Sequence, residues 1–209
     1  MDISWLGHSS FRLRGNSTAV ITDPFSESVG FAMPEVTAPL VTVSTDHPHH
    51  NNAASVKGKP YVISGPGEYE VGGVFVLGLS AGPSSAGATP NTVYLMEIDG
   101  ITVCHLGNLA QPLPSSHIEQ LRDVQVLMIP AGGHGTLGAP KLAEVISLLS
   151  PRLVIPMHYS VPGLAVELDP LEPFIPQLGI EEPLRQQRLT VTPNNLPPSV
   201  RLVILGEGA

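Results

Sequence analysis

The sequence has few charged residues, few aromatic residues and a single cysteine. Charged residues make up 13% of the 209 residues and aromatic residues 5%, although hydrophobic residues reach 42%. The lone Cys104 excludes a disulfide within the chain and is typical of a reducing compartment. No run approaches the roughly 18 consecutive apolar residues that a membrane span needs. We therefore expect a single globular domain over residues 1–209, located in the cytoplasm.

Positive charge is also scarce. The chain has 10 Lys and Arg against 18 Asp and Glu, which gives a formal net charge of -8. A nucleic-acid-binding surface needs a basic stripe, so we expect no nucleic-acid partner. The first residues show no basic segment followed by an apolar one, so we expect no signal peptide. The expected partner is a small-molecule substrate or ligand, and assembly into a homo-oligomer stays open.

Short apolar segments separated by Gly and Pro predict many strands. Residues 91–107 predict a hairpin whose two-residue turn is Asp99-Gly100. Residues 124–130 and 152–159 are continuous apolar runs, which are typical of strands covered on both faces. Residues 78–91 are rich in Gly, Ala and Ser and predict a flexible loop.

Helical patterns are fewer. Residues 115–122 and 139–151 predict helices, and a third, short helix is expected to start near Asn51 and Asn52. Hairpin-linked strands come first along the chain, and strand–helix units follow. This order predicts an α/β (α+β) fold in which sheets pack together with helices outside.

Histidines follow the ends of several predicted strands. His47, His49 and His50 come directly after the apolar residues 40–44, and His158 ends the run at 152–159. A third strand ends at His105, three residues before Asn108. Side chains at strand ends are held rigidly beside a cleft, and imidazole binds Zn, Fe, Ni and Cu well. A solvated polar loop is the alternative reading of the cluster, and His117 and His134 read as surface residues.

Several motifs occur in a recognisable order between Ile3 and Tyr159. They are WLGHSSF, DPF, the histidine-rich loop, GPGEYEVGG, CHLGNL, LMIPAGG and VIPMHY. Together they resemble the metallo-β-lactamase fold superfamily, and within it the small bacterial metal-dependent hydrolases related to ascorbate-6-phosphate lactonases. The resemblance implies an αββα sandwich of two mixed β-sheets with outer helices. It also implies an active site along one edge of the sheets and one or two divalent metals.

The sequence departs from the family's metal motif at several positions. The family's His-x-His-x-Asp-His loop, its later Gly-Asp pair and its final histidine fall on Thr45, His47, His49, His50, Asn108 and His158. Both carboxylate positions are therefore neutral here. A further family histidine, expected between the loop and the Gly-Asp pair, is absent from residues 76–91.

These losses argue against a two-metal centre. Two dications about 3.7 Å apart repel by about 18 kcal/mol at an effective dielectric of about 20, and carboxylates normally offset that repulsion. We expect at most one metal, bound by His49, His50 and His158 with Asn108 as a weak oxygen ligand. Zinc is the favoured metal, manganese, nickel or iron are alternatives, and a degenerate site would bind none.

Other residues are expected to support this site. His47, left without its usual metal, is a candidate general base, with Asp46 beside it. Five residues are expected to line the pocket or orient ligands: His8, Asp23, Thr45, His105 and Glu68. The first functional hypothesis is a metal-dependent hydrolase acting on an ester, lactone or phosphoester. The alternative is a catalytically degenerate family member that acts as a binding or structural protein.

Overall fold

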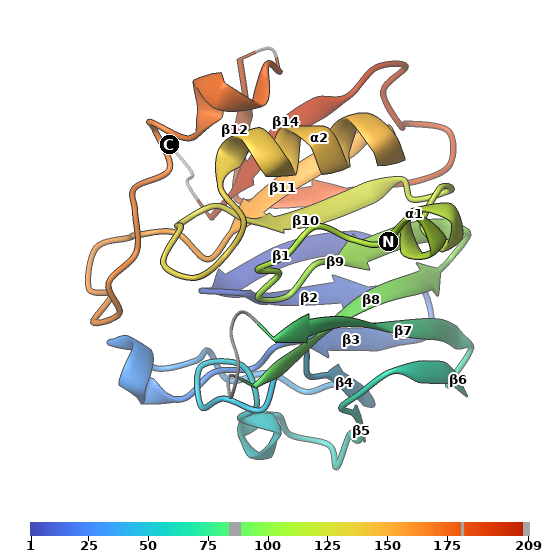
Figure 1. The fold of residues 1–209 in the computed structure, drawn as a ribbon. Helices are drawn as coiled ribbons and strands as arrows, with labels where there is room; N and C mark the ends of the chain where they lie inside the picture. Colours follow the sequence, from blue (N-terminus) through green and yellow to red (C-terminus); the bar gives the residue numbers. More distant parts are fainter. Residues whose placement is uncertain (84–88, 181, 207–209) are drawn as a thin grey trace.

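The computed structural model describes residues 1–83, 89–180 and 182–206. In this part of the chain, two β-sheets pack face to face and two α-helices lie on the outer face of the larger sheet (Figure 1). The predicted sandwich of two mixed β-sheets is confirmed. None of the described helices is both long and apolar enough to cross a membrane.

The smaller sheet has six strands among the described residues, in the order β13-β1-β2-β3-β4-β5. Strands β1, β2 and β3 form an antiparallel meander, and β4 and β5 add to it in parallel. The strands are β1 (Asp2–Gly7), β2 (Ser10–Arg14), β3 (Ala19–Thr22), β4 (Leu40–Thr42), β5 (Tyr61–Ile63) and β13 (Arg188–Thr190).

The larger sheet has eight described strands in the order β12-β14-β11-β10-β9-β8-β7-β6. Its half from β9 to β14 is parallel, and its half from β6 to β9 is antiparallel. The strands are β6 (Gly67–Val71), β7 (Val74–Pro83), β8 (Pro90–Ile98), β9 (Ile101–His105), β10 (Val126–Pro130), β11 (Leu153–Met157), β12 (Leu184–Gln186) and β14 (Arg201–Leu205).

The continuous apolar runs form central strands, as predicted. Along β10, Val126 and Met128 face the core between the sheets, whereas Leu127 and Ile129 face the helices. Side chains alternate across a strand, so a strand covered on both faces must be apolar at every position. Helix α2 (Ala139–Leu149) supplies the outer cover.

Helical structure is otherwise short. Helix α1 spans Ser115–Gln120, and the 3-10 turns are η1 (Glu27–Val29), η2 (Ala53–Ser55) and η3 (Ile175–Leu178). The short helix expected near Asn52 is therefore a single 3-10 turn. Helix α2 ends two residues earlier than predicted because Ser150 adopts a left-handed conformation (φ 45°) before Pro151.

The hairpin over residues 91–107 is confirmed, but the flexible loop predicted at 78–91 is largely wrong. Ile98 pairs with Ile101 around Asp99 and Gly100, both of which have positive φ angles. Strand β7 continues to Pro83 and β8 begins at Pro90, so both ends of the predicted loop are strand. Residues 84–88 lie outside the described residues. Pairing along β7 and β8 overrides a composition that favours a loop.

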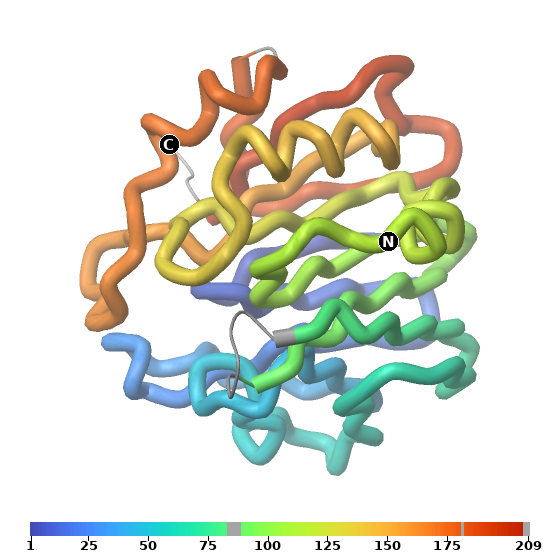
Figure 2. Tube along the Cα trace, viewed as in Figure 1, coloured from blue at the N-terminus to red at the C-terminus, as the bar shows by residue number. Residues whose placement is uncertain are grey.

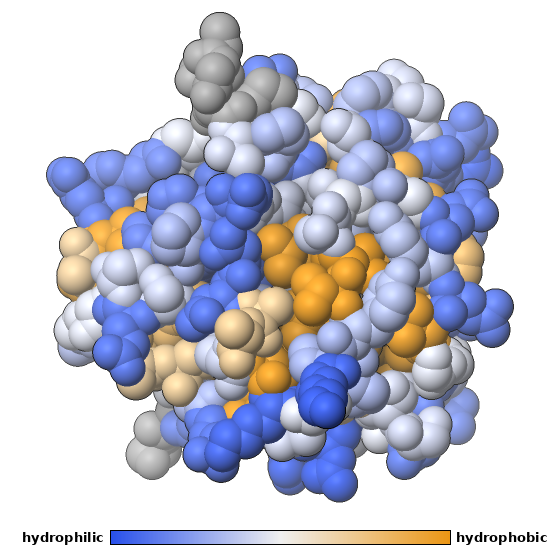
Figure 3. Space-filling model, turned by 90° about the horizontal axis from the view of Figure 1, so that it is seen from below, coloured by the Kyte–Doolittle hydropathy of each residue, from blue (hydrophilic) through white to orange (hydrophobic). Residues whose placement is uncertain are grey.

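The lower end of the molecule carries the two edge strands β5 and β6 (Figure 1). Seen from below, an apolar area lies inside a hydrophilic border (Figure 3). Tyr61 and Val62 on β5 and Phe75 on β7 are among the exposed large hydrophobic residues. The loop after β4 also reaches this lower end, whereas the loops after β10 and β11 lie higher, on the left of the view (Figure 2).

Candidate metal centre

The candidate ligands meet because several strands end at the same side of the sandwich. Strand β2 is antiparallel to both β1 and β3, and β3 is parallel to β4, so β1, β3 and β4 end at one edge. His8, Asp23 and the loop at residues 45–50 follow these three ends. In the larger sheet, parallel strands β9 and β11 end at His105 and just before His158.

Hydrogen bonds join the two sheets at this edge. The carbonyl oxygen of His8 accepts one hydrogen bond from the backbone N–H of His158 and another from Trp5 Nε1, each at 3.0 Å. The Trp5 ring stacks on Tyr159 with centroids 5.3 Å apart. His8 and His158 both have positive φ angles, 49° and 54°. Such backbone strain in non-glycine residues is concentrated at functional sites.

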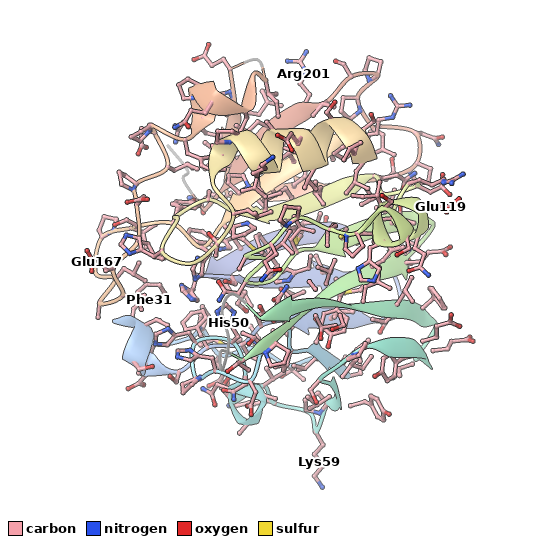
Figure 4. The ribbon with its side chains drawn as sticks, viewed as in Figure 1. Phe31, His50, Lys59, Glu119, Glu167 and Arg201 are labelled. Carbon is pink, nitrogen blue, oxygen red and sulfur yellow. The ribbon has the colours of Figure 1, made fainter. Side chains whose placement is uncertain are left out.

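Three histidines form a compact buried group, here called the histidine trio: His8, His50 and His158. One ring nitrogen from each lies within 4.8 Å of the others. Ring centroids are 4.5 Å apart for His8 and His158, 5.3 Å for His8 and His50, and 5.7 Å for His50 and His158. The exposed fractions are only 1%, 3% and 6% for His8, His50 and His158. In Figure 4, His50 lies inside the molecule, below the helices.

Asp23 orients one member of the trio. Its Oδ2 lies 2.9 Å from His50 Nδ1, while Ser44 donates from its backbone N–H at 2.7 Å and from its hydroxyl at 2.5 Å. Burial alone would raise the pKa of Asp23, but nearby His105 and the hydrogen bonds from His50 and Ser44 lower it. A carboxylate only accepts hydrogen bonds, so His50 carries its proton on Nδ1 and its Nε2 has a free lone pair.

The other two histidines are held neutral. Burial, together with the neighbouring histidines, lowers the pKa of His158 to about 3 and moves the pKa of His8 far below its ordinary value. Both ring nitrogens of His8 and Nδ1 of His158 are buried without a hydrogen-bond partner among the described residues. Neutral imidazoles with unused lone pairs are the donors that zinc and similar divalent metals bind. The trio therefore fits a metal ion.

His47 and His49 lie beside the trio but outside the three-histidine group, although the His49 ring centroid is 5.7 Å from that of His8. The backbone N–H of His49 donates to His47 Nδ1 at 3.3 Å, and the two rings are 4.4 Å apart. His47 is exposed and His49 half-buried. Burial and neighbouring histidines lower the pKa of both. The structure thus places His8, expected at the rim, in the three-histidine group, and leaves His49, expected as a ligand, outside it.

A cavity of about 370 Å³, here called the histidine cavity, lies beside the trio. His50 and His158 line it together with His47, His49 and Asn108. The Oδ1 atom of Asn108 is buried and has no hydrogen-bond partner among the described residues, so it can accept a hydrogen bond or bind a metal.

The remaining predicted residues lie in three different places. His105 is fully buried and accepts from Gly107 N–H at 3.2 Å, so its Nε2–H donates to Ser9 at 2.9 Å and both nitrogens are used within the protein. Thr45 lines the histidine cavity and a neighbouring pocket, and Asp46 lines only that pocket. Glu68 is exposed on edge strand β6 and lines neither.

The far wall of the histidine cavity consists of residues for which the sequence predicted no functional role. His134, Val166, Glu167 and Leu168 form this wall. His134 was expected on the surface, and residues 166–168 belong to a Pro-rich segment without a predicted role. A backbone hydrogen bond explains this placement in part, because the N–H of Asp169 donates to the carbonyl oxygen of Gly132 at 2.8 Å.

Comparisons with known proteins agree with this architecture. A family model described as the β-lactamase superfamily domain matches residues 2–158, so the chain belongs to this superfamily. It is similar to a candidate Zn-dependent hydrolase of the metallo-β-lactamase superfamily from Thermotoga maritima. That solved structure is 34% identical, with a TM-score of 0.82 and coverage of 98% of this chain and 97% of the other.

More distant relatives include archaeal proteins. A UPF0173 metal-dependent hydrolase of Thermococcus kodakarensis is 28% identical over 189 residues, which cover 76% of this chain and 84% of the relative. The structure of a metallo hydrolase from Ignicoccus hospitalis shares the fold, with a TM-score of 0.66 and 20% identity over 99% of this chain and 96% of the other. A bacterial source for this chain therefore stays a prediction.

Proposed function

We propose that this protein is a metal-dependent hydrolase that binds one divalent metal through His8, His50 and His158. The observation that carries the proposal is the buried histidine trio, in which one ring nitrogen of each residue lies within 4.8 Å of the others. Both ring nitrogens of His8 and Nδ1 of His158 have no hydrogen-bond partner among the described residues. The names of the relatives from T. maritima and T. kodakarensis support the hydrolase class. A set of three nitrogen donors favours zinc, and nickel or iron fit it better than manganese does.

The residues around the trio suit hydrolysis. A metal bound there would supply Lewis acidity and lower the pKa of a bound water to about 7. Asp23 would fix the orientation of His50 through Nδ1. His47 lines the cavity, where its ring could reach a water molecule. Its lowered pKa keeps the ring neutral at neutral pH, so the ring can accept a proton from that water.

A second candidate is a binding protein that has lost catalysis. The observation that favours it is the chemistry of the replaced positions in the histidine cavity. His49 and Asn108 stand where the family motif has its two carboxylates, and Thr45 stands where it has a histidine. Among the described residues that line this cavity, Glu167 is the one acid, and it comes from the opposite wall.

Metal content separates the two candidates. Protein purified without a metal-affinity tag and dialysed against zinc is expected to hold one zinc per chain by elemental analysis. His158→Ala should abolish this binding, and hydrolysis of a simple neutral ester should be lost with the metal. Less than about a tenth of a metal per chain after reconstitution would contradict the hydrolase and favour the binding protein.

A further inference from the structure

A second cavity adjoins the histidine cavity. It has a volume of about 550 Å³, and Thr45 and Thr89 line both cavities. A molecule whose reacting group lies beside the histidine trio would therefore extend past Thr45 into this second space. Thr45 occupies the position where the family motif has a larger histidine.

The wall of this second cavity, here called the hydroxyl pocket, combines hydroxyl groups with small apolar surfaces. Valine and proline side chains form the apolar part of its lining. The hydroxyl-bearing residues are Ser44, Thr45, Ser64, Thr89 and Thr92. The Ser44 hydroxyl already donates to Asp23. The other hydroxyls match a compound that presents alternating O–H and C–H groups, because a hydroxyl can both donate and accept.

The hydroxyl pocket is held in shape by a buried tyrosine. Tyr94 Oη donates to the Val43 carbonyl at 2.9 Å and accepts from the Gly65 N–H at 2.7 Å. Burial raises the pKa of Tyr94, so its hydroxyl stays protonated. The Thr92 N–H also donates to the Ser44 carbonyl at 2.7 Å. These bonds join the two sheets, and the pocket is formed before any ligand arrives.

The charges around the two cavities disfavour an anion. No lysine or arginine is among the described residues that line them, whereas Asp46 and Glu167 are. Lys57 and Lys59 line a separate hollow that shares only Val62 with the hydroxyl pocket. Lys59 projects away from the molecule (Figure 4), and Lys57 pairs with Glu35 at 2.6 Å. Phosphate groups are normally recognised by Arg, Lys or a helix N-terminus.

We propose that the hydroxyl pocket binds an uncharged, hydroxyl-rich part of the substrate, so that the enzyme acts on neutral esters or lactones and not on phosphorylated ones. This inference rests on the proposed hydrolase function, because the trio defines where the reacting bond lies. Asp46 would accept hydrogen bonds from substrate hydroxyls. Its carboxylate, which Asn51 holds through a 2.6 Å hydrogen bond, would repel a phosphate.

Binding of a matched pair of probes tests the inference without catalysis. The probes are methyl β-D-glucopyranoside and its 6-phosphate, titrated into the full-length, metal-free protein and followed by ligand-observed NMR. The neutral glucoside is expected to bind at least about tenfold more tightly than the phosphate. Tighter binding of the phosphate, or no binding of the glucoside, would overturn the inference.

Two substitutions at Val62 locate the binding. Val62 is 42% exposed at the pocket wall, and Tyr61 is 55% exposed beside it and does not line the pocket. Val62→Trp should weaken glucoside binding about tenfold, and Val62→Lys should strengthen phosphate binding by a similar factor. Tyr61→Trp and Tyr61→Lys are the matched controls and should change neither. Unchanged binding in both Val62 variants would show that the pocket is not the site.

The metal content of the same variants keeps the two proposals separate. Val62 variants should retain one zinc per chain, since Val62 does not line the histidine cavity. If zinc binds but the glucoside does not, the substrate inference fails and the metal-dependent function stands. If neither zinc nor the glucoside binds, both fail.

Discussion

The histidine trio and the His47–His49 pair lie side by side but differ in what their rings contact. The trio comes from three distant positions in the chain, and its members are 1–6% exposed. Ring nitrogens of His8 and His158 have no hydrogen-bond partner among the described residues. His47 and His49 are neighbours in sequence, lie nearer the solvent, and share a hydrogen bond at 3.3 Å. The dense cluster in the sequence is therefore not the whole of the metal centre.

This difference shows that burial and convergence create the capacity to bind a metal. Each buried polar group without a partner costs about 1–3 kcal/mol in the folded protein. A bound metal would satisfy such groups in the trio, so binding would also stabilise the fold. His47 is exposed and His49 half-buried, so both rings lie nearer the solvent than the trio and gain less from a ligand.

Acidification should have the largest effect, because it should destabilise the protein mainly through the buried histidines of the trio. His8 and His158 have folded pKa values lowered from the ordinary 6.5, with that of His158 at about 3. The unfolded chain takes up protons first, so stability is fully present above about pH 6.5 and is lost as the pH falls toward 3. His8 and His158 alone are expected to make the metal-free protein about 3 kcal/mol less stable at about pH 5.5 than at about pH 7.5. Burial also lowers the pKa of His105, which adds to this loss.

Urea unfolding at the two pH values measures this loss. The double variant His8→Phe, His158→Phe should show a flatter pH dependence, because its rings cannot take up a proton. The matched double variant His47→Phe, His49→Phe should keep nearly the dependence of the parent. An equal response from the two double variants would contradict the distinction between buried and exposed histidines.

Removal of the acceptor behind His50 should have the next largest effect. Asp23→Asn takes away the carboxylate that fixes Nδ1–H of His50, and such partners of metal-binding histidines contribute roughly 10–100-fold to metal affinity. Zinc affinity measured by competition with a chelator should fall within that range. Asp46→Asn is the control, because Asp46 is exposed and lies in the hydroxyl pocket. Equal losses in both variants would refute the role of Asp23.

The smallest effect is expected from the exposed pair. His47→Ala and His49→Ala should each change zinc affinity by less than about threefold, since neither ring belongs to the trio. His47→Ala should still lower the rate of ester hydrolysis through loss of the proposed base. A large drop in zinc affinity for His49→Ala would contradict the trio as the ligand set. It would instead support His49, His50 and His158, the ligands expected from the sequence.

Strand ends could be recognised from the sequence, but their partners across the sandwich could not. The runs before His50 and His158 were correctly predicted as strands, and the family resemblance placed both residues in one site. His8 also follows a predicted strand. Its position beside His158 is set by a backbone hydrogen bond between these two residues, which are 150 positions apart in the sequence. That contact depends on how the two sheets pack, and local patterns carry no information about it.

Composition misled where pairing decides the structure. The Gly, Ala and Ser residues after Gly78 suit a loop, but Leu79 pairs with Val93 and Ser80 with Thr92 in the β7–β8 ladder. Residues 166–168, which lie within a Pro-rich segment, offered no regular pattern, although they form a wall of the histidine cavity. Both features follow from tertiary contacts.

A crystal structure of the zinc-loaded protein, with anomalous scattering measured at the zinc edge, tests the central claim most directly. If one metal binds the trio, one anomalous peak is expected about 2.0–2.1 Å from a ring nitrogen of each of His8, His50 and His158. A peak bound by His47 or His49 without His8, or two peaks at about the 3.5–4 Å separation of a two-metal site, would contradict it.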